Sequence, residues 1–168
     1  MNRLMRILRH RVLDDTDTRR AIGPEVVERL RERVAASERH HSGEIRICVE
    51  AGLPLSYLWR GLAARDRAIT MFGKLRVWDT EHNNGVLIYL LLAEHAIEIV
   101  ADRGLNPHVS AEEWTRIVAG MRDAFRAKQY EQGLSAAVDA VDAVLAHHFP
   151  LEPRQANPNE LPDDPLLG

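Results

Sequence analysis

The stretch that decides the fold is Val77–Gly104, VWDTEHNNGVLIYLLLAEHAIEIVADRG. It contains two runs typical of strands, Val86–Leu92 and Ala96–Val100, and only three residues separate them. So short a link excludes a parallel crossover and predicts an antiparallel hairpin. Because Val86–Leu92 is apolar throughout, with no polar alternation, we expect a central strand that is covered on both faces.

An earlier strand is predicted at Glu44–Glu50, EIRICVE, where apolar residues alternate with Arg46 and Cys48. A helix expected from about Ser56 to Phe72 separates this strand from Val86–Leu92. Strand, helix and strand form a βαβ unit, whose crossover should be right-handed and whose strands should be parallel. The sequence therefore predicts the α/β class: a small mixed sheet, made of the βαβ unit and the antiparallel hairpin, sandwiched by helices.

The remaining chain divides by composition. Residues 1–22 are expected to form a basic N-terminal helix and a polar connector, and residues 23–150 a single α/β domain. A capping box at Ser110 opens another helix within that domain, which has Trp114 and Val118 at core spacing. Residues 151–168 are rich in proline and acidic residues, and we expect a disordered tail.

Composition excludes several classes of function. The formal net charge is −3, which gives no argument for a nucleic-acid partner. Cys48 is the only cysteine, so an intrachain disulfide and a cysteine-rich zinc site are excluded, and we expect a buried, inert thiol. No apolar run approaches the ~20 residues of a membrane helix, and the N-terminus lacks the apolar core of a signal peptide. We therefore expect a cytoplasmic protein.

Residues 1–13, MNRLMRILRHRVL, contain four arginines and no acidic residue. Leu4, Ile7 and Leu8 follow helical spacing, which predicts an apolar stripe with basic flanks. Two interpretations stay open. The helix either docks on the domain, with its arginines solvated or paired, or makes a weak contact with an anionic membrane surface.

The common catalytic motifs are absent from the sequence. It has no GxSxG elbow, no CxxxxxR loop, no HExxH and no Walker A loop. We therefore predict a non-catalytic binding or regulatory module with an as yet unknown protein partner. The alternative is a metal-assisted acid phosphatase in which Arg103 binds the phosphate.

The predicted topology brings polar side chains to one end of the sheet. A parallel first strand starts at the same end as Val86–Leu92, and the antiparallel partner strand finishes there. Oxygen ligands without a thiolate favour calcium over zinc. The predicted ligands are Glu44, Asp79, Glu81, Asn83, Asn84 and Asp102. The alternative is a structural turn at Asn83-Asn84-Gly85, with Asp102 and Glu44 paired to nearby arginines.

The runs NNGVLIYLLL and AIEIVADRG, the GEI that begins the first strand, and the later pattern WxxIVxxMxxAF…YEQGLxxAV resemble a TPM domain, the family of the thylakoid-lumen acid-phosphatase-like protein. The resemblance covers about residues 24–149 and is strongest to short, soluble bacterial members. It implies the α/β fold described above. It also implies phosphatase activity, calcium binding at strand-end loops, or only regulation of a partner, since all three have been assigned within the family. One departure is Asp102-Arg103-Gly104-Leu105-Asn106, where the broader family has Gly-x-Gly-Leu-Glu.

Overall fold

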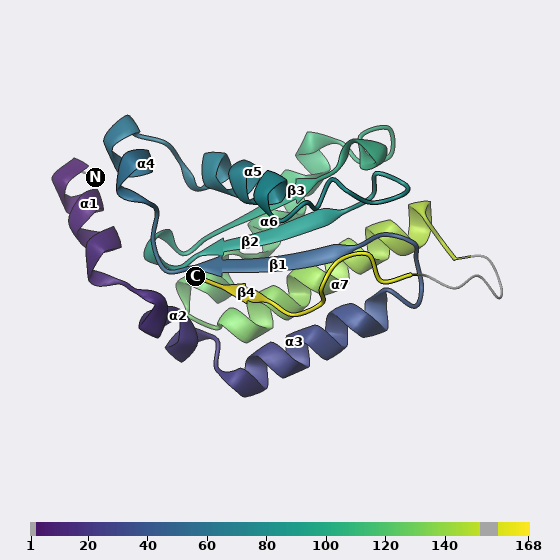
Figure 1. The fold of residues 1–168 in the computed structure, drawn as a ribbon, viewed down its shortest axis with the longest axis horizontal. Coiled ribbons are helices and arrows are strands. Elements are labelled where there is room, and N and C mark those ends of the chain that lie inside the picture. The colour runs from purple at the N-terminus through teal and green to yellow at the C-terminus, as the bar shows by residue number, and fades with distance from the viewer. Residues whose placement is uncertain (1–2, 152–157) are drawn as a thin grey trace.

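The computed structural model describes residues 3–151 and 158–168. Within them, a four-stranded mixed sheet in the order β3-β2-β1-β4 lies between layers of helices (Figure 1). The strands are β1 (Ile45–Glu50), β2 (Val86–Leu91), β3 (Ala96–Ala101) and β4 (Leu166–Leu167). The α-helices are α1 (Arg3–Val12), α2 (Asp15–Ala21), α3 (Pro24–Ser37), α4 (Leu55–Arg60), α5 (Ala64–Lys74), α6 (Ala111–Arg126) and α7 (Tyr130–His148), and two short 3-10 turns are η1 (Leu92–Glu94) and η2 (Arg103–Leu105).

The strand pairing confirms the βαβ unit and the hairpin. β1 runs parallel to β2 with Ile45 opposite Val86, and β3 runs antiparallel to β2 with Ala101 opposite Val86. Every residue of β2 is buried, as expected of a central strand with both faces covered. Cys48 is also fully buried, in agreement with an inert thiol.

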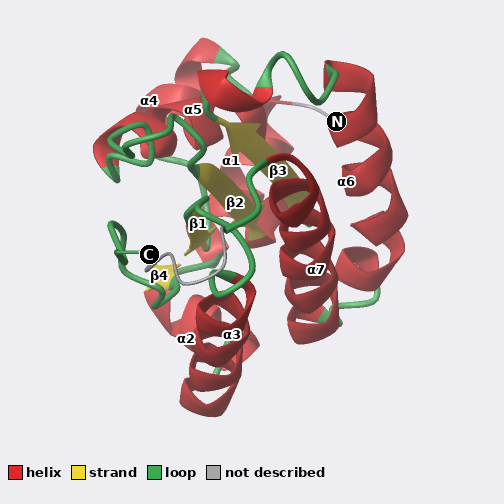
Figure 2. Cartoon of the chain, turned by 90° about the vertical axis from the view of Figure 1, so that its right-hand side faces the viewer, coloured by secondary structure: helices red, strands yellow, loops and turns green. Residues whose placement is uncertain are grey.

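Each face of the sheet is covered by its own group of helices (Figure 2). Helices α3, α6 and α7 pack on one face through residues such as Leu30, Phe125 and Leu145. Helices α4 and α5 pack on the other through Leu58 and Ala68. No helix in the described part of the chain is both long enough and apolar enough to span a membrane.

The single helix expected over residues 56–72 is wrong, because the chain forms two helices there. Gly61 adopts φ 70°, a left-handed conformation that ends α4. The Asp66 carboxylate then accepts the N–H of Ala63 at 2.7 Å and starts α5. Ala68 faces the core, whereas its neighbour Ile69 is 52% exposed.

The polar connector expected after the N-terminal helix is also wrong, because it forms α2. The Asp14 carboxylate accepts the N–H groups of Thr16 and Asp17, and the Asp17 carboxylate accepts the N–H of Asp14. This reciprocal capping satisfies the free N–H groups of the first turn. An Asp-x-x-Asp pattern was therefore the overlooked signal of a helix start.

The disordered tail is a third wrong prediction, for residues 158–168; residues 152–157 lie outside the described residues. Residues 158–168, here called the strap, run along the open edge of β1, where β4 pairs with it in parallel. The guanidinium of Arg46 donates to the carbonyl oxygens of Pro162 and Asp164, and the Gly168 N–H donates to the Val49 carbonyl at 2.9 Å. The prediction of disorder rested on the composition of the tail alone. Composition does not show that the polar face of β1 offers partners to the strap.

Candidate functional site

The strand ends that carry the predicted cation site lie side by side. Glu44 precedes β1, Gly85 precedes β2 and Asp102 follows β3. The Val86 N–H donates to the Glu44 carbonyl at 2.8 Å, and the Asp102 N–H donates to the Gly85 carbonyl at 2.9 Å. Glu44, Gly85 and Asp102 therefore form one row across three strands, as the predicted topology requires.

The two carboxylates in this row nevertheless stay apart. A Cβ on Gly85, which separates them, would lie 2.0 Å from the carbonyl oxygen of Val77, so the Val77 backbone fills the space between them. Glu44 is fully buried under the strap, where it accepts the N–H groups of Glu160 and Leu161 at 3.2 and 3.1 Å. Burial raises the pKa of Glu44 to about 7.

Asp102 and Asn84 are buried in different surroundings. The Asp102 Oδ1 accepts the N–H of Arg103 at 2.7 Å and begins η2. The Asn84 side-chain amide donates to Ser42 Oγ at 3.2 Å. Asp102 Oδ2 and Asn84 Oδ1 have no hydrogen-bond partner in the part of the chain that is described.

The three other predicted ligands lie in the loop before β2. Asp79 is exposed and lies 3.9 Å from the Arg76 guanidinium. Glu81 is exposed as well, and its backbone N–H donates to the Glu160 carboxylate at 3.1 Å. Asn83 has φ 52°, and its Oδ1 accepts from Arg103 Nε at 3.2 Å. These contacts stabilise a turn, as expected of asparagine at a left-handed position.

The structure thus places the six predicted ligands around one end of the sheet without assembling them. Across the described residues, no group of three or more His, Cys, Asp or Glu side chains is placed to hold a metal ion. The predicted phosphate-binding residue Arg103 is exposed, and its side chain donates a hydrogen bond to Asn83. The full ligand set proposed from the sequence does not fit one ion here.

A serine and a histidine do meet elsewhere in the fold, but their geometry is not that of a nucleophile and its base. Ser37 Oγ lies 2.9 Å from His41 Nε2, and the same nitrogen lies 3.4 Å from Asp142. His41 Nδ1 contacts the Gly43 carbonyl at 3.0 Å. In a triad the base uses one nitrogen for the nucleophile and the other for the carboxylate. Ser37 is 4% exposed and His41 is fully buried, so a substrate cannot reach them.

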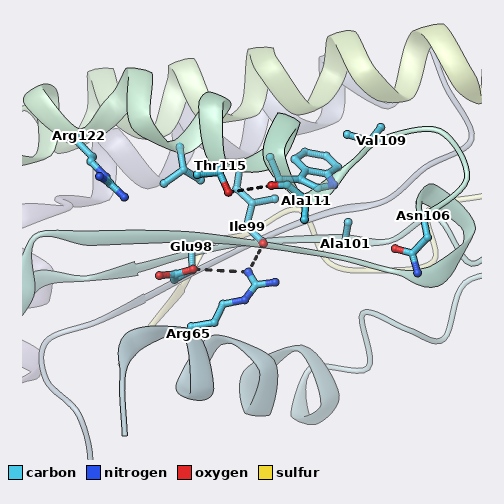
Figure 3. Close-up of a pocket in the computed structure, with 11 residues that line it drawn as sticks. Arg65, Glu98, Ile99, Ala101, Asn106, Val109, Ala111, Thr115 and Arg122 are labelled. Carbon is cyan, nitrogen blue, oxygen red and sulfur yellow. Dashed lines mark hydrogen bonds and ion pairs between the residues drawn. The ribbon is translucent and has the colours of Figure 1, made fainter.

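A groove of about 500 Å³ runs along β3 between α5 and α6 (Figure 3). Half-buried Trp114 and Val118 of α6 give it an apolar wall. Sequence analysis predicted both residues as core, because groove-lining and core positions share the same helical spacing. Only Met121 and Phe125, further along α6, are fully in the core.

Charged side chains border the same groove. The Arg65 guanidinium, from α5, donates to the Ile99 carbonyl at 2.5 Å and lies 3.6 Å from the Glu98 carboxylate. Burial raises the pKa of Glu98, although Arg65 and Arg122 oppose that shift. Arg122 makes no hydrogen bond or ion pair with any residue that the structure describes.

The outer edge of β3 faces the groove. The hydrogen bond from the Asp102 N–H to β2 fixes the alternation of the antiparallel ladder. Residues 96, 98, 100 and 102 exchange hydrogen bonds with β2, and Ile97, Ile99 and Ala101 direct their N–H and C=O groups outward. The bond from Arg65 to the Ile99 carbonyl agrees with that alternation. β3 is an edge strand in the order β3-β2-β1-β4, so these groups have no neighbouring strand.

Comparison with known proteins agrees with this fold. The BA42 protein of the psychrophilic bacterium Bizionia argentinensis, solved by NMR, is similar with a TM-score of 0.75 and 26% identity, over 88% of this chain and 95% of that one. The N-terminal domain of a protein from P. gingivalis is similar in fold, with a TM-score of 0.57 and 23% identity, over 72% of this chain and 76% of that one. No curated protein sequence matches the chain.

The family assignment comes from the sequence itself. The profile of the TPM domain matches residues 16–144, which is most of the chain and includes the βαβ unit, the hairpin, α6 and most of α7. The match agrees with the mixed sheet, the covering helices and the similar solved structures. The chain therefore belongs to the TPM domain family.

Proposed function

We propose that this chain is a non-catalytic binding module that takes an extended segment of a protein partner between α5 and α6, as an added strand beside β3. The observation that carries the proposal is the unpaired outer edge of β3 inside a groove. Strand addition gives affinity through main-chain hydrogen bonds and specificity through pockets for alternate side chains. A guest strand would pair with the outward groups of Ile97, Ile99 and Ala101.

The walls of the groove indicate what the segment carries. Trp114 and Val118 offer an apolar surface for one set of alternate side chains. Arg122 offers a guanidinium to an acidic side chain, because no described carboxylate is paired with it. Arg65 currently bonds the Ile99 carbonyl, which protects the free edge until a guest N–H replaces it.

A display library of linear peptides, selected on the purified full chain, tests the proposal. Enriched peptides should alternate apolar residues and carry an acidic residue. Thr115→Trp fills the groove and should weaken their binding at least about tenfold. Arg116→Trp is the matched control, since Arg116 is exposed on the same helix and does not line the groove. Peptides that bind wild type and Thr115→Trp equally well would refute the groove as the site.

Hydrogen exchange supplies a second, more local readout. The N–H groups of residues 97, 99 and 101 point into the groove, whereas those of residues 98, 100 and 102 are bonded to β2. Addition of a guest strand should slow exchange at the first set and leave the second set unchanged. Protection that spreads equally over both sets would indicate general stabilisation and not strand addition.

Calcium binding at the strand ends is a second candidate, and one observation favours it. Asp102 Oδ2 is buried and has no hydrogen-bond partner among the residues described. A buried oxygen without a partner is costly, and Ca²⁺ accepts such oxygens together with backbone carbonyls. Calorimetry on chelator-treated protein tests it. Binding heat that Asp102→Asn removes supports the site, whereas no heat at millimolar calcium and no change in Tm excludes it.

The phosphatase alternative requires a phosphate-binding site at the strand ends. It needs Arg103, which is exposed beside the same loop, to bind a phosphate near Asp102. Hydrolysis of p-nitrophenyl phosphate by the purified chain, lost in Asp102→Ala, would replace the binding module with an enzyme.

A further inference from the structure

Helix α1 is held on the domain by polar side chains. Arg6 donates to the Glu94 carboxylate at 2.8 Å and to the Leu62 carbonyl at 2.7 Å. His10 Nδ1 accepts the N–H of Leu53 at 2.9 Å, so the ring proton lies on Nε2, which donates to Glu94 at 2.9 Å. These directional bonds fix the rotation of α1 about its own axis.

That rotation packs Ile7 of α1 against the domain. It turns outward an apolar stripe made of Leu4, Met5, Leu8 and Val12. The stripe residues are 62% to 73% exposed and follow the spacing i, i+1, i+4 and i+8, which places them on one side of a helix. α4 lies beside α1 (Figure 1) and adds two further exposed apolar side chains. Six of the eight large apolar side chains exposed among the described residues thus belong to these two helices: Leu4, Met5, Leu8, Val12, Leu55 and Trp59.

Basic side chains border this stripe. Successive helical residues turn by about 100°, which places Arg11 on one side of the stripe and Arg9 on the other. The Arg3 guanidinium lies 5.1 Å from the ring centroid of Trp59. The helix has no acidic residue, and Arg3, Arg9 and Arg11 form no ion pair with the described carboxylates. An apolar stripe with basic flanks is the pattern of a helix that lies in a lipid headgroup layer.

A basic pocket of about 350 Å³ opens beside Arg9. Arg20 of α2, His95 of the hairpin link and Lys128 from the turn before α7 also line it. Burial, together with the charges of Arg9 and Lys128, lowers the pKa of His95. Asp17 lines the pocket as well and lies 3.7 Å from Arg20, so the basic charges exceed the acidic ones.

We propose that α1 and α4 form a docking face for an anionic lipid surface, with the apolar stripe in the acyl boundary and the basic pocket around a phosphate-bearing headgroup. Arg9 joins the two parts, because it flanks the stripe and lines the pocket. A short helix alone gives weak attachment, and basic residues near an anionic surface add to it. The proposal does not rest on the peptide groove, which other residues line.

Vesicle flotation of the full chain tests the apolar part. The chain should float with vesicles of phosphatidylcholine and phosphatidylglycerol, less at high salt, and not with phosphatidylcholine alone. Leu8→Glu should weaken binding at least about tenfold. Ile69→Glu is the matched control, because Ile69 is an exposed apolar residue on α5 and outside this face. Both substitutions are at exposed positions, and melting curves verify that the variants fold.

Substitution of Arg9 tests the basic part. Arg9→Gln should weaken flotation with the anionic vesicles about fivefold, and Arg116→Gln on α6 should leave it unchanged. Equal binding to both vesicle types, or unchanged binding of Leu8→Glu, would overturn the proposal. A dimer seen by light scattering would also overturn the proposal if Leu8→Glu abolishes the dimer and the chain never floats with vesicles. The stripe would then serve self-association.

Discussion

Two buried acids, Glu38 at the end of α3 and Glu44 just before β1, make the stability of the domain fall as the pH rises. Burial raises the pKa of Glu44 to about 7 and that of Glu38 to about 8, from an ordinary value of 4.5. The folded chain therefore holds protons that the unfolded chain has already released. Stability from these groups is complete below pH 4.5 and is lost as the pH rises through about 7 and 8.

The size of the effect follows from the pKa difference. Each unit of difference between folded and unfolded states corresponds to about 1.4 kcal/mol. For Glu44 the shift from 4.5 to about 7 gives roughly 3 kcal/mol as an upper value. The charge of Glu44 also raises the pKa of Glu38, so removal of one acid reduces the effect of the other.

Glu44→Gln is the informative substitution. Glutamine keeps one of the two oxygens that accept the N–H groups of Glu160 and Leu161, and it removes the titration. The loss of the second acceptor lowers stability at every pH, so the informative quantity is the change of stability with pH. Urea unfolding from pH 5 to 8 should show that wild type loses up to roughly 2.5 kcal/mol more than the variant, because part of the upper value is already lost at pH 5. Glu32→Gln, at an exposed position of α3, should follow wild type. Parallel pH profiles for wild type and Glu44→Gln would refute the reasoning.

Other substitutions give equally definite expectations, each read by urea unfolding. Gly85→Ala should destabilise the fold by about 3 kcal/mol or more, because the new Cβ meets the Val77 carbonyl. Gly120→Ala, in open space on α6, should instead stabilise the fold by about 0.5–1 kcal/mol. Arg67→Ala should cost about 3 kcal/mol, because it leaves the largely buried Glu50 carboxylate without its bidentate partner; an effect below about 1 kcal/mol would contradict this. A chain without residues 158–168 should exchange the amides of β1 faster, and unchanged exchange would mean that the strap does not protect that edge.

Sequence patterns predicted the centre of the fold and misjudged its margins. The apolar run of β2 and the short link after it were sufficient for the hairpin, because few other arrangements bury such a strand. The strap was missed because its order depends on partners far away in the chain. Arg46 and Glu44, on one face of β1, already indicated that something polar must cover that face.

The candidate cation site shows a different limit of prediction. Strand topology correctly placed Glu44 and Asp102 at one end of the sheet. It did not reveal that the Val77 backbone packs over Gly85 between them, because that close approach depends on the path of a loop. The sequence left two interpretations of α1 open for a related reason: an apolar stripe does not tell which side of the helix is held down, and here hydrogen bonds to Glu94 decide it.

The strap also has a consequence for how the chain is made. Arg46 and Glu44 obtain their covering partners from a segment more than a hundred residues later, with sequence separations of 116 to 118. During synthesis β1, β2 and β3 emerge first, so the polar face of β1 stays open until residues 158–168 have left the ribosome. Contacts of such long separation form slowly, so we expect docking of the strap to be a late step of folding. Stalled nascent chains that lack the strap should therefore be cut by protease near β1, and chains released with it should resist.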